Sequence, residues 1–301
     1  MEGSSRHTNQ IINSNMLNPI DNQIRNLLKS GLETLEQQLD SDIYTYYGPI
    51  DDSIVPLIKH TIEQIAKEKK HTRLSIVLTT GGGSATAVER YVNIIRNFYD
   101  EVNFIVPDFA YSAGTIFCMS GDNIYMNYYS VLGPIDPQVM NKDKRWVPAL
   151  GYLDKINELI EKAHKGTLTN AEFLILKDFD LAELKGYEQA KELTIDLLKK
   201  WLVKYKFKNW TKKQTSGVPV TQEMKEKRAE EIADRLSDNK IWKSHGRPIN
   251  IEILRDSLNL VIEDYGKDSN LSTNIDSYYS LLDDYVRKNG SQLFIQTRNF
   301  L

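Results

Sequence analysis

The sequence contains a serine in a setting that suits a nucleophile. Ser112 lies in the segment Ala-Tyr-Ser-Ala-Gly at 110–114, between an expected strand and an expected helix. Small neighbours permit a sharp turn there, and the helix that follows would point its N-terminal amides at a reacting oxygen. The match to a nucleophile elbow is partial, because Ala110 stands where the motif has glycine. A serine in this position is more often only a helix N-cap, so Ser112 alone does not identify an enzyme.

Three consecutive glycines at 81–83 could supply backbone hydrogen-bond donors. They follow an apolar run at 74–80, and residues without side chains let a backbone N–H face a ligand oxygen. Two nucleotide-binding interpretations fail, because Thr86 replaces the last glycine of G-x-G-x-x-G and the lysine of a phosphate-binding loop is absent. A plain loop remains the simpler interpretation of these glycines taken by themselves.

A carboxylate that could orient a catalytic base is Asp136. It stands in the segment Gly-Pro-Ile-Asp-Pro-Gln at 133–138, where Gly133, Pro134 and a second proline fix the backbone. A restricted backbone suits a carboxylate that must be held rather than solvated. The alternative is a rigid turn with a capping aspartate.

A serine nucleophile needs a base, and histidine is the usual one at neutral pH. The best placed is His245, in the compact turn Ser-His-Gly-Arg-Pro-Ile at 244–249. The four other histidines lie in segments expected to be solvated or unstructured: His7, His60, His71 and His164. No pair of histidines has zinc-site spacing and Cys118 is the only cysteine, so we expect no metal and no cofactor.

The elements around these residues predict an α/β fold. Short β-branched runs at 74–80, 103–106 and 124–126 alternate with helical patterns, which is typical of a largely parallel sheet covered on both faces. An apolar helical face occupies 24–39, and the pattern is mainly helical from 153 to 235. The tail from Trp242 onward mixes short apolar runs with turns.

The composition is that of an ordinary globular protein. The 301 residues are 41% hydrophobic and 26% charged, with a net charge of −3, so there is no basic surplus for binding nucleic acid. No apolar run approaches the ~20 residues of a membrane helix, and residues 1–15 are polar, without a secretory h-region. We expect the first dozen or so residues to be frayed. The single cysteine, in an apolar stretch, is expected to be buried. We therefore expect a soluble, cytoplasmic protein.

The order of these motifs resembles the core of the Clp protease and crotonase superfamily. The resemblance rests on Gly-Pro-Ile-Asp-Asp-Ser at 48–53, the glycine turn, and Tyr-Ser-Ala-Gly at 111–114. The segments at 133–138 and 244–249 resemble more closely the serine dehydrogenase proteinase family of Clp-fold serine peptidases. The likeness covers residues from about 44 to about 265.

The resemblance implies a catalytic triad in the chain order Ser, Asp, His, unlike Clp protease, where the order is Ser, His, Asp. Ser112 would be the nucleophile, Asp136 the orienting carboxylate and His245 the general base. The amides of Gly83 and Ala113 would form the oxyanion hole. The turns that support these groups would contain Gly82, Gly133 and Pro134.

The resemblance also implies an architecture. We expect an α/β fold with a Clp/crotonase-like core of ββα units and a largely parallel sheet, plus a helical C-terminal extension. The expected organisation has four parts: an N-terminal arm and helix at 1–43, the catalytic core at 44–150, a helical extension at 151–236, and a C-terminal segment at 237–301 that carries the His245 motif.

The same resemblance implies what the protein binds. The expected substrate is a protein or peptide. Clp-fold cores commonly associate, so we expect a homo-oligomer; the helical faces at 21–40 and 187–205 offer apolar stripes for it, and packing inside the monomer is an equal alternative. Several relatives carry a membrane helix, which leaves membrane association open although none is visible in this sequence.

Three other functions compete with the triad peptidase. A Ser/Lys dyad, as in signal peptide peptidases, would use Lys165, Lys200 or Lys204 as the base, and a neutral lysine in that role would need burial. A crotonase-type acyl-CoA enzyme would use the same oxyanion amides for an enolate, but it leaves the Ser112 and His245 motifs unexplained. A non-catalytic scaffold that has kept the fold is the third.

Overall fold

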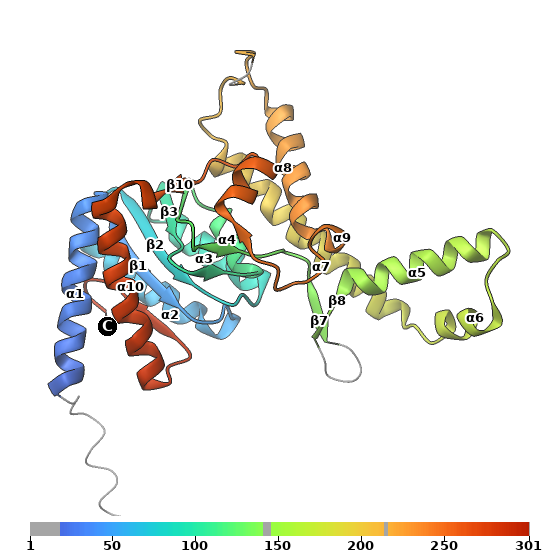
Figure 1. Cartoon of the computed structure of the whole chain (residues 1–301), viewed down its shortest axis with the longest axis horizontal. Coiled ribbons are helices and arrows are strands. Elements are labelled where there is room, and N and C mark those ends of the chain that lie inside the picture. Colours follow the sequence, from blue (N-terminus) through green and yellow to red (C-terminus); the bar gives the residue numbers. More distant parts are fainter. Residues whose placement is uncertain (1–18, 141–145, 214–215, 301) are drawn as a thin grey trace, which may run out of the picture.

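The computed structural model describes residues 19–140, 146–213 and 216–300 (Figure 1). The frayed segment expected at the N-terminus, together with His7, lies outside the described residues. In the described part of the chain, none of the helices is both long enough and apolar enough to span a bilayer.

The fold is built on a six-stranded sheet in the order β10-β5-β3-β2-β1-β11. Its strands are β1 (Asp42–Tyr47), β2 (Arg73–Thr79), β3 (Glu101–Ile105), β5 (Asn123–Met126), β10 (Glu263–Asp264) and β11 (Phe294–Gln296). Neighbouring strands pair in parallel, except that β11 runs antiparallel to β1. The largely parallel sheet expected from the sequence is thus confirmed. Both outer strands, β10 and β11, come from the C-terminal part of the chain.

Helices cover both faces of this sheet (Figure 1). On one face α1 (Pro19–Leu39) packs beside α10 (Ser269–Asn289), and these helices share a buried apolar cluster with Ile43, Val77 and Ile105 of the strands. On the other face lie α2 (Val55–Lys67), α3 (Ala85–Arg96) and α4 (Ala113–Cys118). Alternate strand residues point to opposite faces, so β1, β2 and β3 each contribute residues to this cluster and to a second cluster on the other face.

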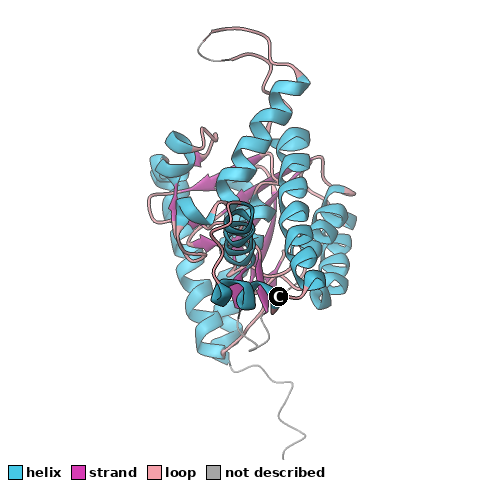
Figure 2. Ribbon diagram, turned by 90° about the vertical axis from the view of Figure 1, so that its right-hand side faces the viewer, coloured by secondary structure: helices cyan, strands magenta, loops and turns pink. Residues whose placement is uncertain are grey.

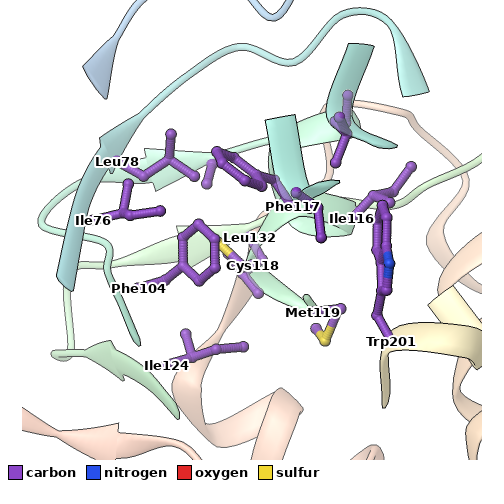
Figure 3. Close-up of a cluster of buried hydrophobic side chains, with 14 of the residues drawn as sticks. Ile76, Leu78, Phe104, Ile116, Phe117, Cys118, Met119, Ile124, Leu132 and Trp201 are labelled. Carbon is purple, nitrogen blue, oxygen red and sulfur yellow. The ribbon is translucent and has the colours of Figure 1, made fainter. Parts of the chain in front are cut away.

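The second cluster surrounds α4, the helix that follows Ser112 (Figure 3). Phe104 of β3 packs edge-on against Phe117, with ring centroids 4.7 Å apart. Cys118 is fully buried here, as expected, and burial raises the pKa of its thiol. The helix behind the nucleophile candidate is therefore anchored in the core.

The region expected to be mainly helical, residues 153–235, forms helices that extend away from the sheet and helices that pack against it. Its helices are α5 (Ala149–His164), α6 (Asn170–Lys177), α7 (Leu181–Trp201), α8 (Gln222–Ser237) and α9 (Asn239–Trp242). α5 and α6 extend away from the sheet in Figure 1, and Figure 2 looks toward the tip of this pair. Leu197, Leu198 and Trp201 of α7 are buried in the core, and α1 is covered by α10. Both apolar stripes considered for assembly thus pack within the chain.

The tail contains more regular structure than its sequence pattern suggested. The expectation of short apolar runs and turns is corrected by α10, a helix of 21 residues. Its Ser, Asn, Asp and Tyr residues have modest helix propensity, but its buried face, which includes Leu271, Ile275, Tyr278 and Leu282, is stabilised by packing. The remaining short elements are η1 (Asp52–Ile54), η2 (Leu202–Lys206), η3 (Ile253–Ser257), η4 (Tyr265–Lys267) and the hairpin of β7 (Gln138–Met140) and β8 (Trp146–Pro148).

Candidate active site

A small three-stranded sheet brings distant parts of the sequence to one place. It consists of β4 (Phe109–Ala110), β6 (Val131–Leu132) and β9 (Ile249–Asn250). β4 and β6 are parallel, whereas β9 is antiparallel to β6. Residues after β4, after β6 and before β9 therefore emerge at the same edge.

The three candidate catalytic residues occupy these positions. Ser112 follows β4, Asp136 follows β6 and His245 precedes β9. The register, with Ala110 beside Leu132 and Leu132 beside Ile249, places these exits next to one another. Two-residue strands are too short to be recognised in a sequence, which is why their pairing could not be predicted.

Ser112 has a strained backbone. Its φ of 54° and ψ of −116° lie outside the regions that a residue with a Cβ normally adopts. It precedes the first residue of α4, yet its hydroxyl makes no capping bond to the helix amides. The simple N-cap interpretation is therefore wrong. Such strain persists only where surrounding structure enforces it, and it is concentrated at functional sites.

Hydrogen bonds hold the Ser112 turn in place. The Tyr111 N–H donates to Thr80 O at 3.0 Å, and the Gly114 N–H donates to Tyr111 O at 2.8 Å. The Thr115 hydroxyl lies 2.9 Å from Ala110 O and 2.8 Å from Gly133 O, and it accepts the Gly133 N–H at 3.0 Å.

Gly133 and Pro134 begin the segment that carries Asp136. A Cβ at Gly133 would lie 2.4 Å from the Tyr111 ring. Gly133 thus lies directly against the turn that carries Ser112.

The glycine turn lies against the first amides of α4. A Cβ on Gly82 would approach the Ser112 Cβ to 2.8 Å and the Ala113 nitrogen to 3.3 Å. Gly83 has a φ of 145°, and a Cβ there would meet Ile50 O at 2.0 Å. Only glycine fits such contacts. The backbone of Gly82 is thereby brought beside Ser112 and the amide of Ala113.

Asp136 and His245 form a hydrogen-bonded pair. Nδ1 of His245 lies 2.8 Å from Oδ1 of Asp136, whose residue is only 2% exposed. Gln138 Nε2 donates to the other carboxylate oxygen, Oδ2, at 2.9 Å. The backbone beside the pair is fixed because the Ile135 N–H donates to Leu236 O at 3.0 Å. Gln138 was not singled out from the sequence, although it belongs to the same segment as Asp136.

His245 sits in a tight turn after α9. Lys243 adopts a left-handed conformation with φ 63°, and the Arg247 N–H donates to Ser244 O at 3.1 Å. The imidazole is 26% exposed. Because Asp136 engages Nδ1, Nε2 is the nitrogen left for a serine proton. Within the described ranges, no hydrogen bond joins the Ser112 hydroxyl to His245.

The lysines considered as alternative bases are exposed. Lys165 lies 3.5 Å from Glu161, and Lys200 lies 3.1 Å from Glu89, with their side chains 70% and 53% exposed. Lys204 is also exposed and lies over the ring of Tyr205. None of the three has the burial that a neutral lysine base requires.

The other histidines that the structure describes are separate from this site. His60 and His164 are exposed, and His71 Nδ1 lies 3.0 Å from the exposed Asp40. In the portion of the chain with described coordinates, no group of three or more His, Cys, Asp or Glu side chains is placed to hold a metal ion.

About half of the chain is similar to two proteins of Methanocaldococcus jannaschii. The chain is 30% identical over 144 residues to the uncharacterized protein MJ1495 of Methanocaldococcus jannaschii, covering 48% of this chain and 44% of that protein. It is 27% identical over 157 residues to MJ0137 of the same organism, covering 52% and 50%. The chain thus spans about half the length of the curated relatives it matches.

A solved structure is also similar in part. It is a mutant of the 1510-N membrane-bound stomatin-specific protease, with 22% sequence identity and a TM-score of 0.32. The match covers 46% of this chain and 72% of that one. At this TM-score the likeness carries no argument about function.

A protein-family model matches a larger part of the chain than any of these proteins does. Residues 37–222 match the family described as ClpP-like SDH-type serine proteinase, a range that includes Ser112 and Asp136 and ends before His245. The match covers more than half of the chain and agrees with the α/β architecture and its largely parallel sheet. The chain belongs to the family of ClpP-like SDH-type serine proteinases.

Proposed function

We propose that this protein is a serine peptidase that hydrolyses peptide bonds with Ser112, His245 and Asp136. The observation that carries the proposal is the hydrogen bond between the buried Asp136 and the partly exposed His245, at the sheet edge where the strained Ser112 emerges. A buried carboxylate on Nδ1 of an imidazole, combined with a serine nucleophile, is the arrangement used for nucleophilic catalysis.

The proposed mechanism follows from this geometry. Nε2 of His245 takes the Ser112 proton as the serine oxygen bonds to the peptide carbonyl carbon. Asp136 keeps the other ring proton on Nδ1 and stabilises the imidazolium. The imidazolium then gives its proton to the departing amine as the C–N bond breaks. Water, deprotonated by His245, releases the acyl group and restores Ser112.

The negative charge of each tetrahedral intermediate would be stabilised by backbone amides. Gly83 and Ala113 are the proposed donors, since the glycine turn lies against the start of α4. A donor of this kind typically contributes ~3 kcal/mol to transition-state stabilisation. The amides need no side chain, so the hole can be removed only by changing the backbone.

Substrate binding would complete the relay. In the described structure the Ser112 hydroxyl has no hydrogen bond to His245, and the imidazole belongs to a short turn that is partly exposed. Catalytic hydrogen bonds are often long or absent without substrate and tighten in the complex. We propose that a bound peptide draws the Ser112 hydroxyl and Nε2 of His245 together.

A fluorophosphonate probe tests the proposal, because only an activated serine attacks its phosphorus and expels fluoride. Mass spectrometry of the native protein should place the adduct on Ser112. Ser112→Ala should remove the label, whereas Ser272→Ala, a change on α10 away from the site, should leave it unaltered. A folded protein that is unlabelled at Ser112 would contradict the peptidase proposal and favour a scaffold or an acyl-CoA enzyme.

A further inference from the structure

A cavity lies at the end of the main sheet where the parallel strands β3 and β5 begin. This cavity of about 720 Å³ opens beside Glu101 and Asn123, the first residues of β3 and β5. Ser112 follows the other end of β3, through the segment that leads into β4. The cavity is therefore separate from the proposed catalytic residues, and the proposed peptidase mechanism gives it no role.

The most unusual residue of the cavity wall is Lys206. It ends the π-helical turn η2, in which the Phe207 N–H donates to Leu202 O at 2.8 Å. A π-turn is rare and is often found at functional sites. Burial lowers the pKa of Lys206 to about 8, although the charges of Glu263 and Asp122 act in the opposite direction.

The Lys206 ammonium has no partner among the described residues, to which it makes neither a hydrogen bond nor an ion pair. The nearby carboxylate of Asp122 is already engaged, since Arg96 donates to it at 2.9 Å and Lys208 pairs with its other oxygen. A partly buried cation that lines a cavity and lacks a counter-ion is unfavourable unless a ligand supplies one.

The rest of the wall favours an anion. Four basic side chains line the cavity, against two acidic ones: Lys206, Lys208, Lys213 and Arg228, against Glu101 and Asp122. Trp210 adds an aromatic wall, which is held edge-on by Phe207 with ring centroids 5.5 Å apart. Charged groups beside an aromatic surface suit a small molecule with an anionic group and an apolar or flat body.

We propose that this cavity binds a small organic anion bearing a phosphate or carboxylate group, with Lys206 as its counter-ion and Trp210 against its body. This anion site does not depend on the proposed peptidase activity, so each of the two proposals can fail without the other. Its volume exceeds that of inorganic phosphate, which leaves space for the rest of an organic molecule.

Calorimetry with two simple anions tests the proposal. Inorganic phosphate and succinate are titrated separately into the wild-type protein, and the arm that gives the tighter saturable binding identifies the preferred group. Lys206→Gln should weaken that binding about tenfold, the size expected from losing one charge-assisted hydrogen bond. Lys204→Gln, an exposed lysine of the same turn that does not line the cavity, is the matched control and should leave the affinity unchanged. No saturable binding of either anion, or equal affinity in both variants, would overturn the proposal.

Chemical labelling gives a second readout that needs no variant. Pyridoxal 5′-phosphate is used as a probe: an unprotonated lysine amine adds to its aldehyde, water leaves, and borohydride reduces the resulting C=N bond. At neutral pH a lysine with pKa about 8 has on the order of 10²-fold more unprotonated amine than an ordinary lysine. Peptide mapping should find Lys206 labelled first, with slower labelling by pyridoxal, which lacks the phosphate, and protection by the preferred anion. Equal labelling by pyridoxal without protection would show a reactive amine and no anion site, which contradicts the proposal.

Discussion

Nδ1 of His245 lies 2.8 Å from Oδ1 of Asp136, although 109 positions separate the two residues in the sequence. The pairing of β6 with β9 brings them together, because the segment that leaves β6 and the segment that enters β9 meet at one sheet edge. The antiparallel direction of β9 is essential, since a parallel strand would carry His245 to the far edge. The topology therefore accommodates the proposed chain order Ser, Asp, His, which differs from the order in Clp protease.

Substitution of Ser112 separates its chemical role from its backbone strain. Ser112→Ala and Ser112→Gly should each lower kcat by about 10⁴ to 10⁶ in a peptide hydrolysis assay, as expected for the nucleophile of a unit that acts together. The glycine variant should be the more stable of the two, by about 1 kcal/mol in urea unfolding, because glycine accepts the positive φ that strains alanine. Equal stability of the two variants would contradict the strain, and retained turnover would remove Ser112 as the nucleophile.

Asp136→Asn tests the orienting carboxylate. The asparagine keeps the shape but offers no charge to an imidazolium, and its amide can hold the ring in the wrong tautomer. We expect kcat to fall by about 10⁴ while KM changes little. Asp276→Asn on α10 is the control, because that carboxylate lies away from the site. An Asp136→Asn enzyme with wild-type kcat would show that the pair is structural.

Gln138 donates to Oδ2 of Asp136 while Oδ1 faces His245, so we expect it to act as a positioning residue. Gln138→Leu removes a hydrogen bond to a charged group, which is worth about 1.5–3 kcal/mol. We expect kcat to fall by about 10- to 100-fold with KM unchanged, because the group does not touch the substrate. A purely structural role would instead lower the melting temperature at unchanged kcat of the folded fraction.

Alanine substitutions at two nearby glycines should have different effects on activity. A Cβ at Gly83 would lie 2.0 Å from Ile50 O, whereas a Cβ at Gly81 would have no neighbour within 4 Å. Gly83→Ala should displace the backbone of the proposed oxyanion hole and lose at least about 10²-fold in kcat. Gly81→Ala should retain activity, so the ratio between the two measures how closely the turn is fitted. Full activity of a folded Gly83→Ala protein would remove its amide from the mechanism.

Cys118 should report on unfolding. Burial raises the pKa of its thiol, so the folded state keeps the thiol protonated where an exposed cysteine, with pKa about 8.5, ionises. Folding stability should therefore fall as pH rises above that value. A thiol reagent at pH 8 should react only as fast as the protein opens, and fast reaction in the native protein would show that α4 is not packed as described.

Much of the main sheet could be predicted from the sequence, because β2, β3 and β5 are apolar β-branched runs separated by amphipathic helices. β1 was not identified, since its Asp, Thr and Tyr residues show no simple alternation, and α10 was hidden by its polar composition. The expected burial of Cys118 is confirmed.

The sequence motifs identified the candidate site residues but did not predict which of them contact one another in the fold. The pairing of Asp136 with His245 depends on strands of two residues, and the role of Gln138 depends on a side-chain contact. The partial burial of Lys206 is also not predictable from the sequence, because its neighbours Tyr205 and Lys208 suggest a solvated helix end. Each of these features arises from tertiary packing.

The proposed mechanism requires Ser112 and His245 to share one proton. A crystal structure of the protein phosphonylated by a fluorophosphonate is the decisive measurement, because the adduct mimics the tetrahedral intermediate at the serine oxygen. We expect Nε2 of His245 within about 3.2 Å of the Ser112 oxygen, with Nδ1 still on Asp136. An adduct in which another base occupies that position, and His245 stays beyond hydrogen-bond distance, would disprove the mechanism.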